Sequence, residues 1–304
     1  MKFNYQFPLK AIKRWEEWSE GHQLADVAVA AEAAGFDVCS STDHPYPDAT
    51  WLKQGGHQDF EVFTTLAFMA AATTRIRVMT YVMIAGYRNP YLAARSAATL
   101  DYMSNGRLTL GMGAGYLKEE FEVLGASFED RGKRFDATIK AMQNAWKGEV
   151  SDYDDPYFPA KNAIMTPLPK QRPGPPIWIG GNSKAALRRV AELAQGWLPF
   201  EQLPETSKVT RTPALSSIEE LTDMIGHLKE LRAEKGNTDP LDVCFAPMGA
   251  TTVDGHTDFI AERLPDYEKA GVTYISYDGR ARSWKDCLRE IELMGDVIAK
   301  HSAG

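Results

Sequence analysis

Short apolar segments alternate with helix-like segments along the whole chain. Eight runs rich in β-branched or aromatic residues have the length of strands: 3–7, 36–40, 76–84, 107–112, 176–179, 196–200, 243–248 and 272–277. Strands that are separated by helices pair in parallel through right-handed crossovers. Repetition of this unit over residues 1–304 therefore predicts one α/β domain, a single closed (β/α)8 TIM barrel. In such a barrel, chemistry takes place where strands end and the following loops begin.

The segments between these runs repeat apolar residues at helical spacing. Phe135, Ile139 and Met142, for example, fall on one face of a helix. We interpret such stripes as the faces that pack on the barrel. A capping box formed by Ser216 and Glu219 predicts the start of one of the later helices.

Two stretches interrupt the pattern. Residues 149–175 and 199–216 are long, polar and rich in proline. Long loops in compact domains usually carry function. Both are therefore expected to be insertions on the carboxyl-terminal face of the barrel.

Composition excludes several classes of partner. The net charge is −7, and basic residues are spread along the chain without a Lys/Arg tract, which argues against binding to nucleic acid or anionic membranes. No apolar run is long enough for a membrane helix, and the N-terminus lacks the apolar stretch of a signal peptide. Cys39, Cys244 and Cys287 are too few and too widely spaced for a disulfide framework. A cytoplasmic protein is expected.

A polar cluster follows the second predicted strand. Thr42, Asp43 and His44 stand at a strand end, and a histidine there can exchange a proton near neutral pH. The alternative is a turn in which Asp43 and His44 only satisfy backbone groups. His44 is the only histidine that the pattern puts at a strand end, so a metal-dependent hydrolase has little support and no metal site is expected.

Glycines mark the end of the fourth strand. Gly111, Gly113 and Gly115 alternate with other residues, and glycine lets a ligand approach the backbone closely. The spacing G-x-G-x-G differs from the dinucleotide fingerprint G-x-G-x-x-G, so we reject a Rossmann fold.

A second glycine pair opens the helix after the fifth strand. Gly180, Gly181 and Asn182 precede that helix, and free N–H groups at a helix start bind phosphate well. Lys184 and Arg188 add positive charge one turn apart. The alternative is a plain glycine turn followed by an N-cap serine.

Taken in order, these strand ends resemble the luciferase-like monooxygenase superfamily over nearly the whole chain. The segments with this resemblance are 42–44, 88–90, 106–116, 119–121, 131–135 and 177–181. The run 129–134 and Trp146 look most like the subgroup assigned to coenzyme F420. The resemblance implies a barrel with a tricyclic ring in its mouth, F420 as cofactor with FMN as the alternative, a small-molecule substrate and a homodimer.

The resemblance also implies roles for individual residues. His44 and Tyr116 would be catalytic, and Tyr81–Val82 would be a bulge behind the ring, often with a non-prolyl cis peptide. The residues implied at the cofactor are Asp43, His44, Tyr81, Val82, Ala114, Gly115, Tyr116, Gly180, Gly181 and Asn182.

The family resemblance and the aromatic residues also restrict the class of substrate that we expect. Sugar-phosphate dehydrogenases of the superfamily have a glutamate where this chain has Tyr116, and the sequence shows no obvious cationic site for a substrate phosphate, so a sugar phosphate is not expected. Aromatic residues near the loops favour an apolar or ring-bearing substrate instead: Trp51, Tyr87, Tyr116, Tyr157, Phe158, Trp197 and Phe200.

Three functions follow, in order of preference. The first is F420-dependent hydride transfer to or from an organic substrate. The second is an FMN-dependent monooxygenase or reductase. The third is a barrel without redox chemistry, either a non-catalytic flavin- or ligand-binding protein or a hydrolase-type barrel.

Overall fold

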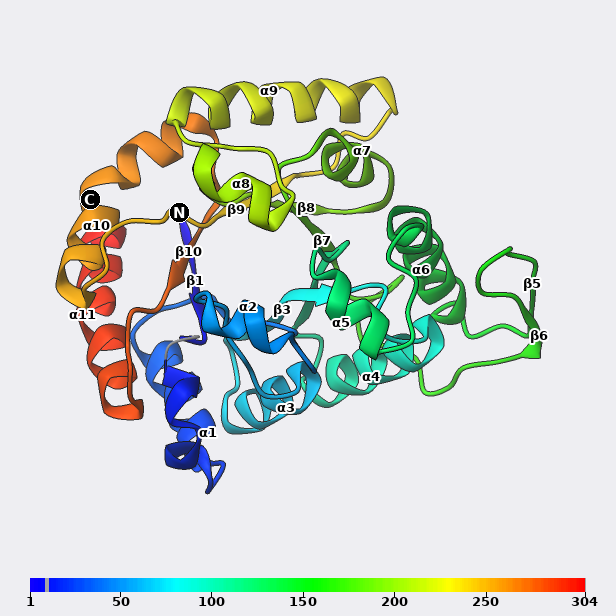
Figure 1. Ribbon diagram of the computed structural model, residues 1–304, viewed down its shortest axis with the longest axis horizontal. Helices are drawn as coiled ribbons and strands as arrows, with labels where there is room; N and C mark the ends of the chain where they lie inside the picture. The colour runs from blue at the N-terminus through cyan, green and yellow to red at the C-terminus, as the bar shows by residue number, and fades with distance from the viewer. Residues whose placement is uncertain (9–10, 304) are drawn as a thin grey trace.

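The structure is a computed structural model that describes residues 1–8 and 11–303, apart from the side chain of Val209. Its parallel strands form a closed barrel in the order β1-β10-β9-β8-β7-β4-β3-β2, which confirms the predicted fold (Figure 1). The barrel strands are β1 (Lys2–Gln6), β2 (Val38–Ser41), β3 (Arg77–Ile84), β4 (Leu108–Gly113), β7 (Ile177–Gly180), β8 (Gly196–Leu198), β9 (Asp242–Phe245) and β10 (Tyr274–Asp278). Each overlaps one of the runs predicted from the sequence.

Helices surround the barrel. They are η1 (Ala11–Trp18), α1 (His22–Ala33), α2 (Ala49–Lys53), α3 (Val62–Ala72), α4 (Pro90–Met103), α5 (Lys118–Val123), α6 (Arg131–Ala145), α7 (Lys184–Leu193), α8 (Pro204–Thr210), α9 (Ile218–Glu234), α10 (Val253–Ala270) and α11 (Trp284–Ala303). The stripe predicted in α6 is confirmed, because Phe135, Ile139 and Met142 are at most 1% exposed. Full burial of side chains of this size contributes about 1.5–3 kcal/mol each.

The capping box of α9 lies one residue later than predicted. The Ser217 hydroxyl accepts from the Glu220 amide, and the Glu220 carboxylate accepts from the Ser216 amide. The shift has a local cause. Leu215 forms an isolated β-bridge with Gln202, so the chain is still extended just before the helix begins.

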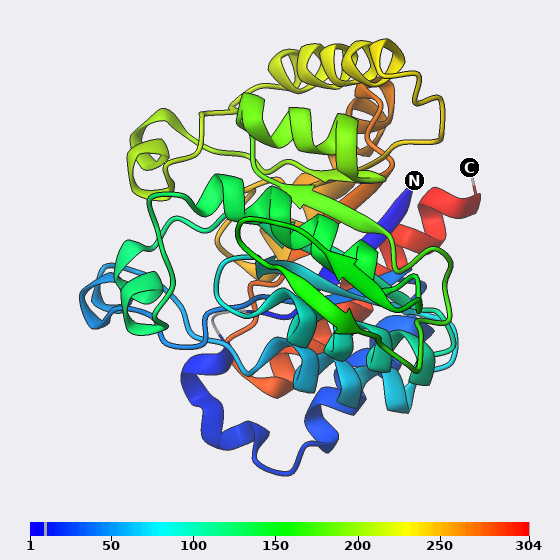
Figure 2. The ribbon, with the colours of Figure 1, turned by 90° about the vertical axis from the view of Figure 1, so that its right-hand side faces the viewer.

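The two insertions join the barrel at different ends of its strands. Residues 149–175 join α6 to β7 and contain the hairpin of β5 (Ser151–Tyr153) and β6 (Ala160–Ala163), which lies outside the barrel (Figure 2). Within this insertion, Gln171 accepts from Arg77 and donates to the Leu108 carbonyl, at the amino ends of β3 and β4.

The expectation of an insertion on the carboxyl-terminal face is therefore wrong for 149–175. The physical reason is its position in the chain, since it follows a helix and leads into a strand. Residues 199–216 follow β8 instead, carry α8 and lie on the carboxyl-terminal face as expected.

The cysteines and helices agree with two further expectations. Cys39, Cys244 and Cys287 are free thiols and are buried, in line with the expectation that they form no disulfide framework. Within the described part of the chain, no helix combines the length and apolar character needed to cross a membrane.

Candidate active site

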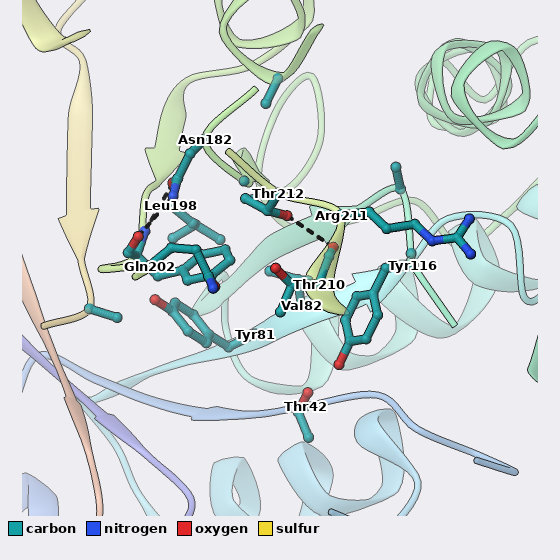
Figure 3. A pocket seen from close by; sticks show the side chains of 18 of the residues that line it. Thr42, Tyr81, Val82, Tyr116, Asn182, Leu198, Gln202, Thr210, Arg211 and Thr212 are labelled. Carbon is teal, nitrogen blue, oxygen red and sulfur yellow. Dashed lines mark hydrogen bonds between the residues drawn. The ribbon is translucent and has the colours of Figure 1, made fainter. Parts of the chain in front are cut away.

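A cavity of about 970 Å³ opens between the carboxyl ends of the strands (Figure 3). Every residue that the family resemblance implied at the cofactor lines it. These residues are Asp43, His44, Tyr81, Val82, Ala114, Gly115, Tyr116, Gly180, Gly181 and Asn182. They come from β2, β3, β4, β7 and the turns that follow, so the barrel brings together segments that lie far apart in the sequence.

One wall of the cavity is apolar and closely fitted. The Tyr81–Val82 peptide is cis, and the β3–β4 register shifts there, as the resemblance implied. A Cβ on Gly113 would lie 2.8 Å from Val82 Cγ2, and one on Gly180 would lie 3.2 Å from Val82 Cγ1. Val82 therefore fits between β4 and β7 only because both neighbours are glycine. The result is a wall against which a flat ring can lie.

His44 is held by a carboxylate that the sequence analysis did not assign. Its Nδ1 lies 2.9 Å from Oε2 of Glu120 in α5, which also accepts from the Tyr87 hydroxyl at 2.7 Å and from the Tyr46 amide at 2.9 Å. Burial would raise the pKa of Glu120, but these hydrogen bonds outweigh it and lower the pKa below its usual value. An ionised carboxylate can only accept, so His44 Nδ1 bears a hydrogen; in the neutral imidazole this tautomer leaves the lone pair on Nε2.

A second histidine lines the cavity beside the first. The His57 ring centroid lies 4.8 Å from that of His44 and 5.3 Å from that of Trp51. Burial, and then the nearby His44, lower the pKa of His57 to about 3, so it is neutral near pH 7. His57 lies in a loop beyond α2 rather than at a strand end, which is why no local pattern indicated it. Among the described residues, no three His, Cys, Asp or Glu side chains gather as a metal site requires.

Asp43 does not contact His44. Its carboxylate forms a bidentate ion pair with Arg88, at 2.5 and 2.9 Å, and accepts from the Ile84 amide at 3.0 Å. This network fixes the turn after β2 against β3 and neutralises the Asp43 charge.

Tyr116 points into the cavity near His44, with ring centroids 6.2 Å apart, and faces the Thr42 side chain (Figure 3). Burial, and then the charge of Glu120, raise the pKa of Tyr116 to about 12. The phenol therefore stays protonated near neutral pH and can donate a hydrogen bond.

The turn after β7 both leads into the capped start of α7 and binds the insertion 199–216. Gly181 has φ +108°, and the Ser183 hydroxyl caps α7 by accepting from the Ala186 amide. The Asn182 side chain does not point its amide at the cavity: it donates to the carbonyls of Phe200, at 2.9 Å, and Pro213, at 3.2 Å. Asn182 therefore ties the turn to the insertion 199–216.

Arg188 is not available to an anion at the start of α7, in contrast to the expectation from sequence. Its guanidinium pairs with Asp136 of α6 and with Glu192 one turn later in α7. The sequence showed the charge of Arg188 but not the carboxylate that α6 brings to it.

Only some of the aromatic residues that we expected near the substrate lie at the cavity. Tyr116 and Phe200 line the cavity, and the Trp51 ring lies 4.8 Å from that of His44. The others do not line it: Tyr87 binds Glu120, Trp197 is a core residue, and Tyr157 and Phe158 lie beside Arg134.

Arginines also line the cavity, although the sequence analysis located no cationic site for a substrate phosphate. They are Arg131, Arg189, Arg211 and Arg280. Arg280 donates to its neighbour Asp278 and to the carbonyl of Ala250, which holds the loop after β9 at the rim.

A buried carboxylate forms hydrogen bonds to the backbone at that rim. Glu290 of α11 is fully buried and accepts from the Tyr5 hydroxyl at 2.7 Å, the Arg280 amide at 2.8 Å and the Ala281 amide at 2.9 Å. Burial raises the pKa of Glu290 to about 7 despite these donors.

Glu290 is expected to make folding stability fall as the pH rises. Between pH about 4.5 and about 7, the native state keeps a proton that the unfolded chain has released, so the free energy of unfolding decreases with pH in that window. The loss is about 1.4 kcal/mol for each unit by which the two pKa values differ. Glu290→Gln, which cannot titrate, should show a flatter dependence in denaturant unfolding measured across this range.

The matched control is Glu292→Gln, an exposed position in the same helix. Burial also raises the pKa of Asp59 to about 7, so Asp59 adds a slope of the same sign to every variant. The contribution of Glu290 is therefore the difference between wild type and Glu290→Gln in how the free energy of unfolding depends on pH. Identical slopes in the two proteins would contradict the prediction.

Comparison with known proteins identifies the family. A model of the luciferase-like monooxygenase family matches residues 13–254. The chain belongs to this family. It is therefore an enzyme of the oxidoreductase or monooxygenase type, and the resemblance found in the sequence is confirmed.

Relatives extend this finding. An uncharacterized protein of Mycobacterium tuberculosis is 32% identical over 261 residues, which cover 82% of each chain. An F420-dependent glucose-6-phosphate dehydrogenase of Tsukamurella paurometabola is 32% identical over 184 residues, covering 58% of this chain and 52% of that protein. The chain thus matches about half the length of the dehydrogenase. The crystal structure of the monooxygenase RslO1 from Streptomyces bottropensis has the same fold, with a TM-score of 0.81, 19% identity, and coverage of 99% and 100% of the two chains.

Proposed function

We propose that this protein is an F420-dependent oxidoreductase that moves a hydride between the deazaflavin ring and an organic substrate. The observation that supports it best is one cavity that combines an apolar wall at Val82, a helix start at Ser183 and the pair formed by His44 and Glu120. The dehydrogenase of T. paurometabola, described as F420-dependent, supports the choice of cofactor.

The chain offers a place for each part of such a cofactor. The wall formed by Val82, Ala114 and Gly115 would hold the face of the ring, and the N–H groups of Asn182 and Ser183 at the start of α7 would hold the phosphate. The Gly181 N–H donates to the Leu198 carbonyl at 3.2 Å, so Gly181 would contribute space for close approach rather than a donor. When bound, F420 supplies a ring carbon that accepts or gives a hydride. The protein positions the two reactants and keeps water away.

His44 would handle the proton that accompanies the hydride. When a hydride leaves the carbon of an alcohol, the hydroxyl proton must leave as well, and the lone pair on His44 Nε2 can take it. Glu120 holds the ring in that tautomer through Nδ1. Tyr116 can donate a hydrogen bond to the same substrate oxygen because it stays protonated. In the reverse direction, His44 returns the proton to the oxygen.

The aromatic part of the cavity supports a ring-bearing or apolar substrate. Tyr116 and Phe200 line it, and Trp51 packs against His44. The named activity of the T. paurometabola relative points to a sugar phosphate, so substrate screens should include sugar phosphates beside alcohols with apolar rings.

The cofactor is tested by titration of the purified protein. Quenching of cofactor fluorescence should give a dissociation constant for F420 at least tenfold lower than for FMN, a difference of about 1.4 kcal/mol. Tighter binding of FMN would contradict the proposal and favour a flavin-dependent monooxygenase or reductase of the same family. Binding of neither compound would contradict both. Bleaching of bound F420 by members of the substrate screen then identifies the substrate class.

A further inference from the structure

Two arginines at the mouth of the cavity converge on one aromatic ring. The guanidinium carbon of Arg131, at the start of α6, lies 3.9 Å from the centroid of Phe128, and that of Arg211 lies 4.9 Å from the same centroid. Arg211 follows α8 in the insertion 199–216 and has φ +51°, in the left-handed region. Figure 3 shows Arg211 and Thr210 beside Tyr116 at the cavity.

These two arginines differ from the other cavity arginines in their partners. Arg189 pairs with Asp136, and Arg280 pairs with Asp278. Within the described residues, no carboxylate lies at salt-bridge distance from Arg131 or Arg211.

Most N–H donors of these two guanidinium groups have no hydrogen-bond acceptor among the described residues. Arg131 donates to the carbonyls of Gly115 and Phe128, which uses two of its five N–H groups. The guanidinium group of Arg211 makes no hydrogen bond to the described residues and contacts the Phe128 ring instead. Burial, and then the charge of Arg211, lower the pKa of Arg131, so the two cations repel each other in the protein alone.

The surroundings of this pair also suit a polar ligand. The Thr210 hydroxyl oxygen is buried and has no hydrogen-bond partner in the described part of the chain, although Thr210 lines the cavity. The start of α7 belongs to the same cavity, because Ser183 and Ala186 line it. Two unpaired cations, an unsatisfied hydroxyl and a helix start thus line one cavity.

We propose that Arg131 and Arg211 bind the acidic side chain of the cofactor, and that the insertion 199–216 thereby selects F420 over FMN. The inference rests on the proposed function. F420 bears glutamate carboxylates beyond its phosphate, whereas FMN ends at a single phosphate. Arginine recognises both carboxylates and phosphates through bidentate hydrogen bonds. An anion at this end of the cavity would remove the repulsion between the two guanidinium groups.

The test compares two ligands that share a ring. One is F420; the other is its deazaflavin with the ribityl chain alone, which has no phosphate or glutamate. Arg211→Gln should weaken F420 binding about tenfold, or about 1.4 kcal/mol, and change binding of the uncharged deazaflavin less than twofold. Arg211→Lys should keep most of the affinity because it keeps the charge. Added salt should weaken F420 binding to wild type more than to Arg211→Gln.

Arg263→Gln is the matched control. Arg263 lies 3.9 Å from the Phe259 ring, the same kind of contact, but does not line the cavity. It should leave both affinities unchanged. Gln at position 211 has the same backbone requirement as arginine, so the fold should be retained.

Several results would overturn the proposal. One is unchanged F420 affinity in Arg211→Gln, and another is an equal loss for both ligands, which would indicate an effect on the ring site. Unchanged F420 affinity with a raised KM for acidic substrates would assign the arginines to the substrate instead. A wild-type protein that fails to bind F420 contradicts the proposed function itself, and with it this inference.

Discussion

Replacement of His44 by alanine is expected to lower kcat by about 10²–10⁴-fold, the usual contribution of general acid–base catalysis. The variant removes the only group that we assign to proton exchange, but leaves the wall at Val82 and the turn at Gly181 in place. Cofactor affinity should therefore stay within a few-fold of wild type. Steady-state rates with a substrate from the F420 screen, together with fluorescence titration of the cofactor, measure the two quantities separately.

Two further variants sharpen this test. Glu120→Gln keeps the shape of the partner but removes its charge, so kcat should fall less than in His44→Ala and its pH profile should shift. His227→Ala, an exposed histidine on α9, should behave as wild type. If His44→Ala keeps nearly full turnover but loses the cofactor, His44 is a binding residue. Tyr116 then becomes the next candidate for the proton.

Gly181→Val is expected to weaken cofactor binding at least tenfold, or about 1.4 kcal/mol. Gly181 has φ +108°, and a Cβ added there would meet only the Ala186 Cβ, at 3.9 Å. The added Cβ would thus not clash with the protein, but the side chain would stand where the proposed phosphate must approach the turn. Fluorescence titration with F420 measures the loss, and thermal unfolding shows whether the fold is retained.

The positive φ itself has a cost in stability, about 1–3 kcal/mol for a non-glycine residue. Gly236→Val controls for that cost, because Gly236 has φ +72°, nothing within 4 Å of an added Cβ, and a position outside the cavity. Both variants should unfold at lower temperature, and only Gly181→Val should lose the cofactor. Equal F420 affinities in the two variants would remove the phosphate assignment.

The strands and helices of the barrel could be predicted well because local sequence patterns reflect which side chains are buried. Runs of β-branched residues and helical stripes record which faces are buried, so strand and helix positions could be inferred. The strand-end rule then placed His44 and Gly181 at the mouth of the barrel, and the family resemblance added Val82. Where two serines and two glutamates stood side by side, as at Ser216 and Glu219, sequence could not decide which pair forms the cap. The bridge between Leu215 and Gln202 decides it.

Residues that reach the cavity through tertiary contacts were not predicted. Glu120 was part of the resemblance, but only the packing of α5 brings it to His44. A weak signal existed, since Glu120 lies about one helical turn after Tyr116, which ends the glycine-rich run. His57 and Arg211 lie in irregular segments with no periodicity, so their approach to the site depends on how those segments fold back.

The link through Asn182 has a consequence for how this site can change over generations. Asn182 binds the carbonyls of Phe200 and Pro213 and accepts from the Phe200 amide. All three partners are backbone groups, which every residue except proline provides in full. Mutations can therefore replace side chains in this loop without releasing it from the turn after β7. Descendants of one ancestor could acquire different preferences at the mouth of the barrel while the turn after β7 keeps its shape.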